Sequence, residues 1–353
     1  MPKPKPAQPP DAPDVRIIAG VSIPVTHELV PVGKVQLDGD NPRIRFLTQH
    51  GNGSAPLNEE ALMKLIREQP GYDSLQRAIR KNGGLEEPIL IRADGRVVEG
   101  NTRLTVYKTL LAAPARRNDP QWQRIAVLRL PEDVPEHLIA MMMASYHIGG
   151  KEKWKALAKA EHVKYLKETH NLSVEQITDC TRLTPAEVQQ LLDAYDYFIE
   201  ELLPKLPKGQ GVDELSDKFS YALEFIRSRK LRDIRKDPKH RSTVAKLIVK
   251  GKLKKGAQVR ELHKILNDKE ASKVIKKEGF EAAKKLRGET DPTVDSQIFG
   301  AMVRLTKSLK KMRQQDVRRL QTQDEAQRIV RDLVDAIALV ARLANVDLGA
   351  GVA

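Results

Sequence analysis

Residues 97–104 read Val97-Val98-Glu99-Gly100-Asn101-Thr102-Arg103-Leu104, a segment that joins a short apolar strand to a helix through a single glycine. The first turn of a helix offers unpaired N–H groups and the positive end of the helix dipole. Gly100 lets the backbone approach a ligand, and Arg103 carries a fork of donors that suits a phosphate. The segment therefore predicts an anion site, in the first place for a nucleotide phosphate. The alternative is a capped helix in which Arg103 only forms a surface ion pair.

Two motifs precede this turn in the chain. Asn41-Pro42-Arg43 comes first, and Gly83-Gly84-Leu85-Glu86-Glu87-Pro88-Ile89-Leu90-Ile91 then enters a strand. Asp94-Gly95 predicts a hairpin turn just before Val97. In this order, the three motifs resemble the N-terminal domain of the ParB/sulfiredoxin superfamily. The resemblance covers residues 27–148 and continues into helical sequence as far as residue 200.

The resemblance implies a fold and a choice of activities. The superfamily includes DNA-segregation clamps that bind CTP, sulfinic-acid reductases, free-serine kinases and nucleases. It implies a ligand as well, which is CTP or another nucleotide with Mg²⁺. Its nucleotide-binding positions fall here on Gly100, Asn101, Thr102 and Arg103, on Asn41 and Arg43, and on the strand entry with Leu85, Pro88 and Ile89.

The sequence also departs from individual members of the superfamily. ParB proteins that hydrolyse CTP carry a glutamate-asparagine-x-x-arginine motif, and the comparable residues 143–150 lack both the glutamate and the arginine. Nucleotide triphosphatase activity is therefore left open. Sulfiredoxins need a cysteine in the glycine turn, and Asn101-Thr102 supplies none, so that activity is not expected. Glu99 is a candidate catalytic base or magnesium partner, as in the serine kinases, or it only pairs locally. His147 is a candidate for phosphate contact or proton transfer, with an ordinary surface histidine as the alternative.

Composition limits the class of protein. The chain has 353 residues, of which 40% are hydrophobic, and length alone suggests two or three domains. No stretch approaches 18 apolar residues, so no membrane span is expected. The lone Cys180 excludes an internal disulfide and a cysteine-based zinc site, and we predict no metal centre. The start of the chain is too polar for a signal peptide, which favours a cytoplasmic protein.

Positive charge is concentrated in one part of the chain. The net charge is +14, which favours a polyanionic partner. Between Lys205 and Glu289 there are 25 Lys or Arg against 12 Asp or Glu. This excess predicts salt-sensitive contact with DNA phosphates, and a solvated helical surface is the alternative. The basic residues chosen as DNA contacts are Lys252, Lys254, Lys255 and Arg260.

The pattern of elements predicts an α+β protein whose strands all lie in the first half. Strands are expected at 30–37, 88–92, 96–99 and 124–130, with helices at 58–67, 73–82, 102–112 and 132–143. From residue 151 onward only helices are expected. The predicted division is a disordered Pro-rich tail (1–24), a ParB-like nucleotide-binding domain (25–150), a helix-turn-helix (151–204), a basic helical region (205–290) and a C-terminal helical hairpin (291–353).

Two helix starts define the predicted helix-turn-helix. Ser173 with Gln176 forms one capping box, and Thr184 with Glu187 forms the next. The second helix, Pro185 to Tyr197, would read DNA; a plain helical hairpin is the alternative. The predicted DNA contacts are Thr181, Arg182, Gln189 and Gln190. The exposed positions of the reading helix include no Lys or Arg, so the phosphate contacts must come from elsewhere.

The last two predicted helices are amphipathic. They span 297–313 and 324–344, the latter capped by Thr322 and Glu325. Their apolar positions predict self-association as a homodimer or docking on another domain, with simple core packing as the alternative. The predicted interface residues are Leu305, Leu309, Met312, Ile329, Leu333, Ile337, Leu339 and Val340.

Together these patterns favour a ParB-like, nucleotide-responsive DNA-binding protein. Its role would be plasmid or chromosome partition, or transcriptional regulation. The alternative from another class is an enzyme on the same fold, a small-molecule kinase or nuclease acting through Glu99 and magnesium. A third alternative is an adaptor that binds only other proteins.

Overall fold

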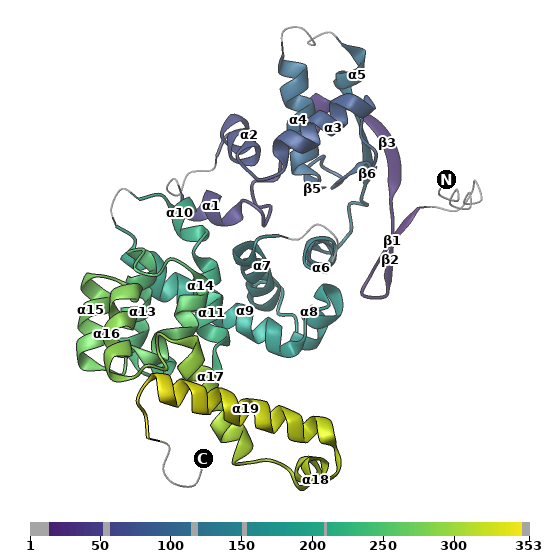
Figure 1. Cartoon of the computed structure of the whole chain (residues 1–353). Coiled ribbons are helices and arrows are strands. Elements are labelled where there is room, and N and C mark those ends of the chain that lie inside the picture. The colour runs from purple at the N-terminus through teal and green to yellow at the C-terminus, as the bar shows by residue number, and fades with distance from the viewer. Residues whose placement is uncertain (1–13, 52–56, 114–118, 150–153, 208–209, 348–353) are drawn as a thin grey trace. The chain divides into compact units, whose positions relative to one another are not determined.

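The computed structural model describes residues 14–51, 57–113, 119–149, 154–207 and 210–347 (Figure 1). The chain divides into two compact units, Met1–Asn267 and Asp268–Ala353. Within the described residues every strand lies in the first unit, and only helices follow residue 151. The predicted α+β class is confirmed, whereas the five-part division remains a prediction. None of the helices described has the length and apolar character needed to cross a membrane.

A four-stranded sheet lies in the first unit, with strand order β3-β6-β4-β5. The strands are β3 (Thr26–Pro31), β6 (Arg124–Arg129), β4 (Ile89–Ile91) and β5 (Val97–Glu99). β6 runs antiparallel to β3 and parallel to β4, and β4 and β5 form an antiparallel hairpin. Of the two middle strands, β4 reads Ile-Leu-Ile and is wholly buried, as expected for a strand covered on both faces.

Six helices lie in the same part of the chain: α1 (Arg45–His50), α2 (Glu59–Arg67), α3 (Tyr72–Asn82), α4 (Asn101–Ala112), α5 (Pro120–Gln123) and α6 (Glu136–His147). Helices α2, α3 and α4 share one aliphatic core with the sheet. Asn58 caps α2 through its side chain, and Gly83, at φ 72°, ends α3. The turn chemistry of the sequence thus sets the limits of these helices.

The segment predicted as a helix-turn-helix contains α8 (Val174–Thr181) and α9 (Pro185–Tyr197), which pack on α7 (Ala156–Glu168). Both predicted capping boxes are present. Ile177, Val188 and Leu192 are buried between the helices, as expected, and Leu183 is half-buried. A π-helical turn, Phe198–Leu202, and a 3-10 turn, Leu203–Lys205, continue the chain beyond α9.

Short helices complete the first unit: α10 (Val212–Ser216), α11 (Phe219–Arg227), α12 (Arg232–Lys236), α13 (Pro238–Val249) and α14 (Gly256–Glu261). The second unit contains α15 (Lys269–Lys277), α16 (Phe280–Thr290), α17 (Gln297–Leu309), α18 (Gln314–Thr322) and α19 (Asp324–Leu343). In the first unit α11 packs against both α9 and α14, and in the second α15 packs against α16.

Two predictions near the N-terminus were wrong. Residues 15–24, assigned to a disordered tail, form a hairpin of β1 (Val15–Ile18) and β2 (Val21–Pro24). Ala19 and Gly20 both have positive φ, 49° and 80°, the combination that a two-residue hairpin turn requires. The strand expected at 30–37 ends at Pro31, and a 3-10 turn follows. Residues 1–13 lie outside the described residues.

Two further corrections concern the second unit. The helix expected at 297–313 ends at Leu309, and the separate helix α18 follows it. Thr322 does not cap α19, because its hydroxyl donates to the Arg318 carbonyl at 3.1 Å. The N-cap of α19 is Gln323, and it makes no side-chain capping bond.

Candidate functional site

The glycine turn can hold no other residue without rearrangement. Gly100 is the N-cap of α4 with φ 115° and ψ 19°, in the region that favours glycine. A Cβ atom at this position would lie 2.5 Å from Cγ2 and 2.8 Å from Cβ of Ile89. No side chain caps the first turn of α4. The turn therefore has the uncapped helix N-terminus that an anion site requires.

Asn101 binds the turn to the loop that carries the first motif. Its Oδ1 accepts a hydrogen bond from the Asp38 N–H at 3.0 Å, and its Nδ2 donates to the Asp38 carbonyl at 2.8 Å. The side chain is buried. Two bonds to the backbone of Asp38 fix the loop against the start of α4, so the amide of Asn101 holds the site together.

The first motif and the glycine turn meet directly. Arg43 Nη1 donates to Thr102 Oγ1 at 3.2 Å, across 59 residues of sequence. The loop before it is fixed by Asn41, whose Oδ1 accepts from the Arg43 N–H at 3.0 Å. The structure thus brings together Asn41, Arg43 and the turn that begins at Gly100, with a guanidinium beside the uncapped N-terminus.

Arg103 bonds both to the strand entry and to the end of β5. Its Nη1 donates to the carbonyls of Glu87 and Pro88 at 2.8 and 3.1 Å, and its Nη2 pairs with the Glu99 carboxylate. Both side chains of the ion pair are largely buried. A phosphate would approach a guanidinium that already has an anionic partner. Structural and phosphate-binding roles are both compatible with this position.

The residues of the turn fit a nucleotide phosphate better than they fit a magnesium ion. A phosphate would meet the uncapped N-terminus of α4 and the Arg43 guanidinium. A cation would need the Glu99 carboxylate, which is engaged with Arg103. Among the described residues, no three His, Cys, Asp or Glu side chains are grouped so as to hold a metal ion.

A buried ion pair that was not predicted from the sequence connects this region to α7. Arg45, two residues after Arg43, donates from Nε to Glu161 Oε1 on α7 at 2.9 Å. The Arg45 guanidinium also lies 4.5 Å from the centre of the Tyr165 ring. Burial raises the pKa of Glu161, and the charge of Arg45 opposes that shift. The only signal in the sequence is a charged residue between Ile44 and Phe46.

His147 and His162 belong to a row of aromatic rings that contact one another. The His147 ring stacks on Trp154 with centroids 4.7 Å apart, and Trp154 meets His162 edge-on at 5.2 Å. His162 is fully buried, its Nε2 donates to the Ala140 carbonyl at 2.9 Å, and burial lowers its pKa to about 3. His147 is therefore part of the packing at the end of α6.

The predicted DNA contacts differ in their exposure. Arg182 is exposed at the end of α8, and Gln189 is exposed on α9, where it donates to Asp193 at 2.7 Å. Gln190 accepts from Arg227 Nε at 3.0 Å. Thr181 does not fit the prediction. It is 1% exposed and its hydroxyl donates to the Ile177 carbonyl, so its side chain has no surface for DNA.

The chosen basic residues lie around the start of α14. Lys254 and Lys255 are exposed, and Lys252 is half-buried. Arg260 is exposed and pairs with Glu224 of α11 at 2.8 Å. Because α14 packs on α11 and α11 packs on α9, this region is connected through α11 to the predicted helix-turn-helix.

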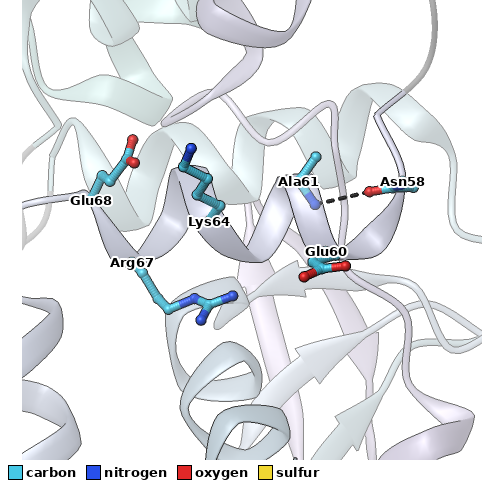
Figure 2. Close-up of a pocket in the computed structure, with 6 residues that line it drawn as sticks. All are labelled: Asn58, Glu60, Ala61, Lys64, Arg67 and Glu68. Carbon is cyan, nitrogen blue, oxygen red and sulfur yellow. Dashed lines mark hydrogen bonds between the residues drawn. The ribbon is translucent and has the colours of Figure 1, made fainter.

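A surface pocket lies along α2 (Figure 2). Figure 2 shows the side chain of Asn58 accepting from the Ala61 N–H, a bond of 2.9 Å. The lining residues are Asn58, Glu60, Ala61, Lys64, Arg67 and Glu68. They carry charges of both signs and include no residue of the glycine turn, so this pocket is separate from the candidate phosphate site.

No protein-family model matches the chain, and no curated protein matches it. Among solved structures, the chain is similar to ParB of Caulobacter crescentus complexed to the centromeric parS site. That match has 15% identity over 67% of this chain and 98% of the other, with a TM-score of 0.31. A Pnob8-like ParB N-domain has 11% identity over 88% of this chain and 98% of the other, with a TM-score of 0.33.

A third match is the C. crescentus ParB complexed with CTP-γ-S, with 16% identity over 64% of this chain and 99% of the other, and a TM-score of 0.21. All three are ParB proteins or ParB N-domains, the family whose motifs the sequence resembles. At these identities and TM-scores, the likeness decides nothing about the ligands or partners of this chain.

Proposed function

We propose that this chain is a nucleotide-responsive, DNA-binding protein of the ParB type that serves partition or transcriptional regulation. The observation that carries the proposal is the contact between Arg43 and Thr102 at 3.2 Å, beside the uncapped N-terminus of α4. This contact joins two motifs far apart in the sequence at the one turn where Gly100 is sterically required. An uncapped helix start with an adjacent guanidinium is suited to phosphate.

In this proposal the N–H groups of the first turn of α4 bind a nucleotide phosphate. Arg43 adds a charged donor from the opposite loop, and Arg103 adds a second if its pair with Glu99 opens. CTP or another nucleotide would supply the phosphate charge. The enzyme alternative would need the Glu99 carboxylate to be available, and Arg103 occupies it.

The response to nucleotide would pass through the segment from Asn41 to Arg45. Arg43 lies at the phosphate turn, and Arg45 is paired with Glu161 on α7, which packs against α9 of the helix-turn-helix. A ligand that moves Arg43 would displace Arg45 and so alter a buried ion pair. The segment is thus a candidate two-state element, which the nucleotide biases.

DNA would meet the exposed face of α9, with Arg182, Gln189 and Gln190 near the bases. Lys252, Lys254, Lys255 and Arg260 would contribute contacts to phosphates. Two copies of the chain would associate through α17 and α19, because the apolar residues on these helices are largely exposed. A two-fold protein suits a palindromic DNA site.

Thermal unfolding with CTP, ATP or GTP, each with MgCl₂, tests the nucleotide site. A ligand that binds only the folded state raises the unfolding midpoint. We expect at least one nucleotide to raise the midpoint of the wild type, and Arg43→Gln to abolish that rise. Arg67→Gln on α2, whose Nε donates to the Met63 carbonyl of its own helix at 3.2 Å, is the matched control and should keep it. If no nucleotide stabilises the wild type, the turn is structural and the proposal is wrong.

A further inference from the structure

The reading helix lacks positive charge of its own. The exposed or half-buried positions of α9 include Gln189, Gln190 and Asp193, and the helix contains no Lys or Arg. Protein–DNA complexes take half or more of their hydrogen bonds from phosphate and sugar, and these contacts fix the register of the reading helix. The groups that hold the phosphates beside α9 must therefore come from a neighbouring element.

One basic segment borders α9 directly. Residues 227–236 hold six Lys or Arg and one Asp. The segment begins at the end of α11, which packs on α9, and Arg227 Nε donates to Gln190 of α9 at 3.0 Å. Arg235 also lies within electrostatic reach of α9: burial lowers its pKa, and Asp193 opposes that shift.

The segment is fixed in place by its own packing. Leu231 and Ile234 are buried, and Arg235 Nη1 donates to the carbonyls of Phe225 and Ser228 at 2.8 and 2.7 Å. Arg229, Lys230 and Arg232 remain exposed. The backbone of this segment is already fixed. Binding to a phosphate backbone would therefore restrict little more than the three cationic side chains themselves.

These three cations also differ from several basic side chains of the same unit that form ion pairs. Lys164, Lys205 and Arg260 each pair with a nearby carboxylate, which is what a solvated helical surface usually shows. Within the part of the chain that the structure describes, no carboxylate pairs with Arg229, Lys230 or Arg232. Their charge is therefore available to an external anion.

We infer that residues 227–236 form the phosphate-binding flank of the helix-turn-helix, where Arg229, Lys230 and Arg232 contact the DNA backbone beside α9. This inference rests on the proposed DNA-binding function and adds a surface to it. The flank is separate in sequence from the basic residues at 252–260. Arg227 has a different role, since its hydrogen bond to Gln190 positions a side chain of the reading helix.

The test compares two triple variants of the full-length chain that lose the same charge. The first is Arg229→Gln/Lys230→Gln/Arg232→Gln. The control is Lys269→Gln/Lys276→Gln/Lys285→Gln, three exposed residues of α15 and α16 in the second unit. The probe is a labelled 24-base-pair duplex of mixed sequence, its length about two turns at 10–10.5 base pairs each. Fluorescence anisotropy gives its Kd from 50 to 200 mM NaCl.

The flank variant should bind at least about tenfold more weakly at 100 mM NaCl, and its log–log salt slope should fall by about 2–3 units, one for each lost phosphate contact. The control should change Kd by less than about threefold, with a slope change below about one unit. Circular dichroism of both variants checks that they fold. If wild type and control bind with a steep salt slope and the flank variant matches them, the inference is overturned while DNA binding stands. If the wild type does not bind the duplex at all, both the inference and the proposed DNA-binding function fail.

Discussion

At the scale of single residues, Gly100 is where sterics and proposed function coincide. Its positive φ, and the 2.5 Å that would separate a Cβ at this position from Cγ2 of Ile89, mean that any side chain must displace β4 or the turn. We expect Gly100→Ala to lower the free energy of unfolding by about 2–4 kcal/mol, from backbone strain and overpacking together. Urea unfolding measures this. Gly33→Ala is the control, because nothing lies within 4 Å of a Cβ there and its φ is not positive. Equal stability of the two variants would contradict the steric account.

A second residue-scale prediction concerns pH. Burial, together with the charges of Arg45, His147 and His170, lowers the pKa of His162 to about 3 from its ordinary 6.5, and the bond to Ala140 opposes this. His162 binds a proton more tightly in the unfolded chain than in the folded one. The free energy of unfolding is therefore highest above pH 6.5 and declines as the pH falls toward 3. The decline is about 1.4 kcal/mol per pH unit, or about 2 kcal/mol between pH 6.5 and 5.

Urea unfolding of the wild type and of His162→Gln at pH 7.5 and pH 5 isolates this effect. The glutamine keeps a donor for the Ala140 carbonyl and does not titrate. We expect the wild type to lose about 2 kcal/mol more than the variant on acidification. The same loss in both proteins would assign the pH dependence to other groups.

At the scale of elements, the Arg45–Glu161 ion pair joins α1, beside the candidate phosphate site, to α7, which packs on the predicted helix-turn-helix. Arg45 and Glu161 are each at least nine-tenths buried. Removing one partner of such a pair leaves an uncompensated buried charge, so Glu161→Leu should cost about 3–5 kcal/mol of stability. The double variant Arg45→Met/Glu161→Leu should recover much of that loss.

The double variant also tests the coupling. It should still bind nucleotide and DNA, but nucleotide should no longer change its affinity for DNA. Anisotropy titrations of both proteins, with and without nucleotide, measure this. If the double variant responds to nucleotide as the wild type does, the signal does not pass through this pair.

The elements also show what the sequence can and cannot predict. The starts of α8 and α9 were predicted correctly, because Ser173 and Thr184 have local partners three residues on. The meeting of Arg43 with Thr102 was expected only from family resemblance, since its two sides lie far apart in sequence. The β1–β2 hairpin was missed because Ala19-Gly20 is a weaker turn signal than Asn-Gly. The Arg45–Glu161 pair carries no local signal, because it depends on how two helices pack.

At the scale of the whole molecule, the C-terminal helices leave most of their apolar side chains exposed. In the described part of the second unit, α17 and α18 bury no residue and α19 buries only Ala341. Of the predicted interface residues, Leu305, Leu309, Ile329, Ile337, Leu339 and Val340 are exposed, and Met312 and Leu333 are half-buried. Homodimerisation through this surface remains a prediction.

Light scattering at micromolar concentration tests the dimer. We expect the full-length chain to be a dimer and Ile337→Asp/Val340→Asp to be a folded monomer, because two charges in an apolar interface cannot be desolvated without a partner. Gln314→Asp/Gln321→Asp adds the same charge at exposed polar positions of α18 and should remain dimeric. A wild-type chain that is monomeric would refute the prediction.

The most direct test of the central claim is the linkage between nucleotide and DNA. Isothermal titration calorimetry would measure the Kd of CTP, ATP and GTP for the chain alone and for the chain saturated with duplex DNA. We predict that one nucleotide binds, and that DNA changes its Kd by about fivefold or more, a coupling free energy of about 1 kcal/mol. Nucleotide binding with the same Kd in both states, or no binding of any nucleotide in either, would contradict the claim.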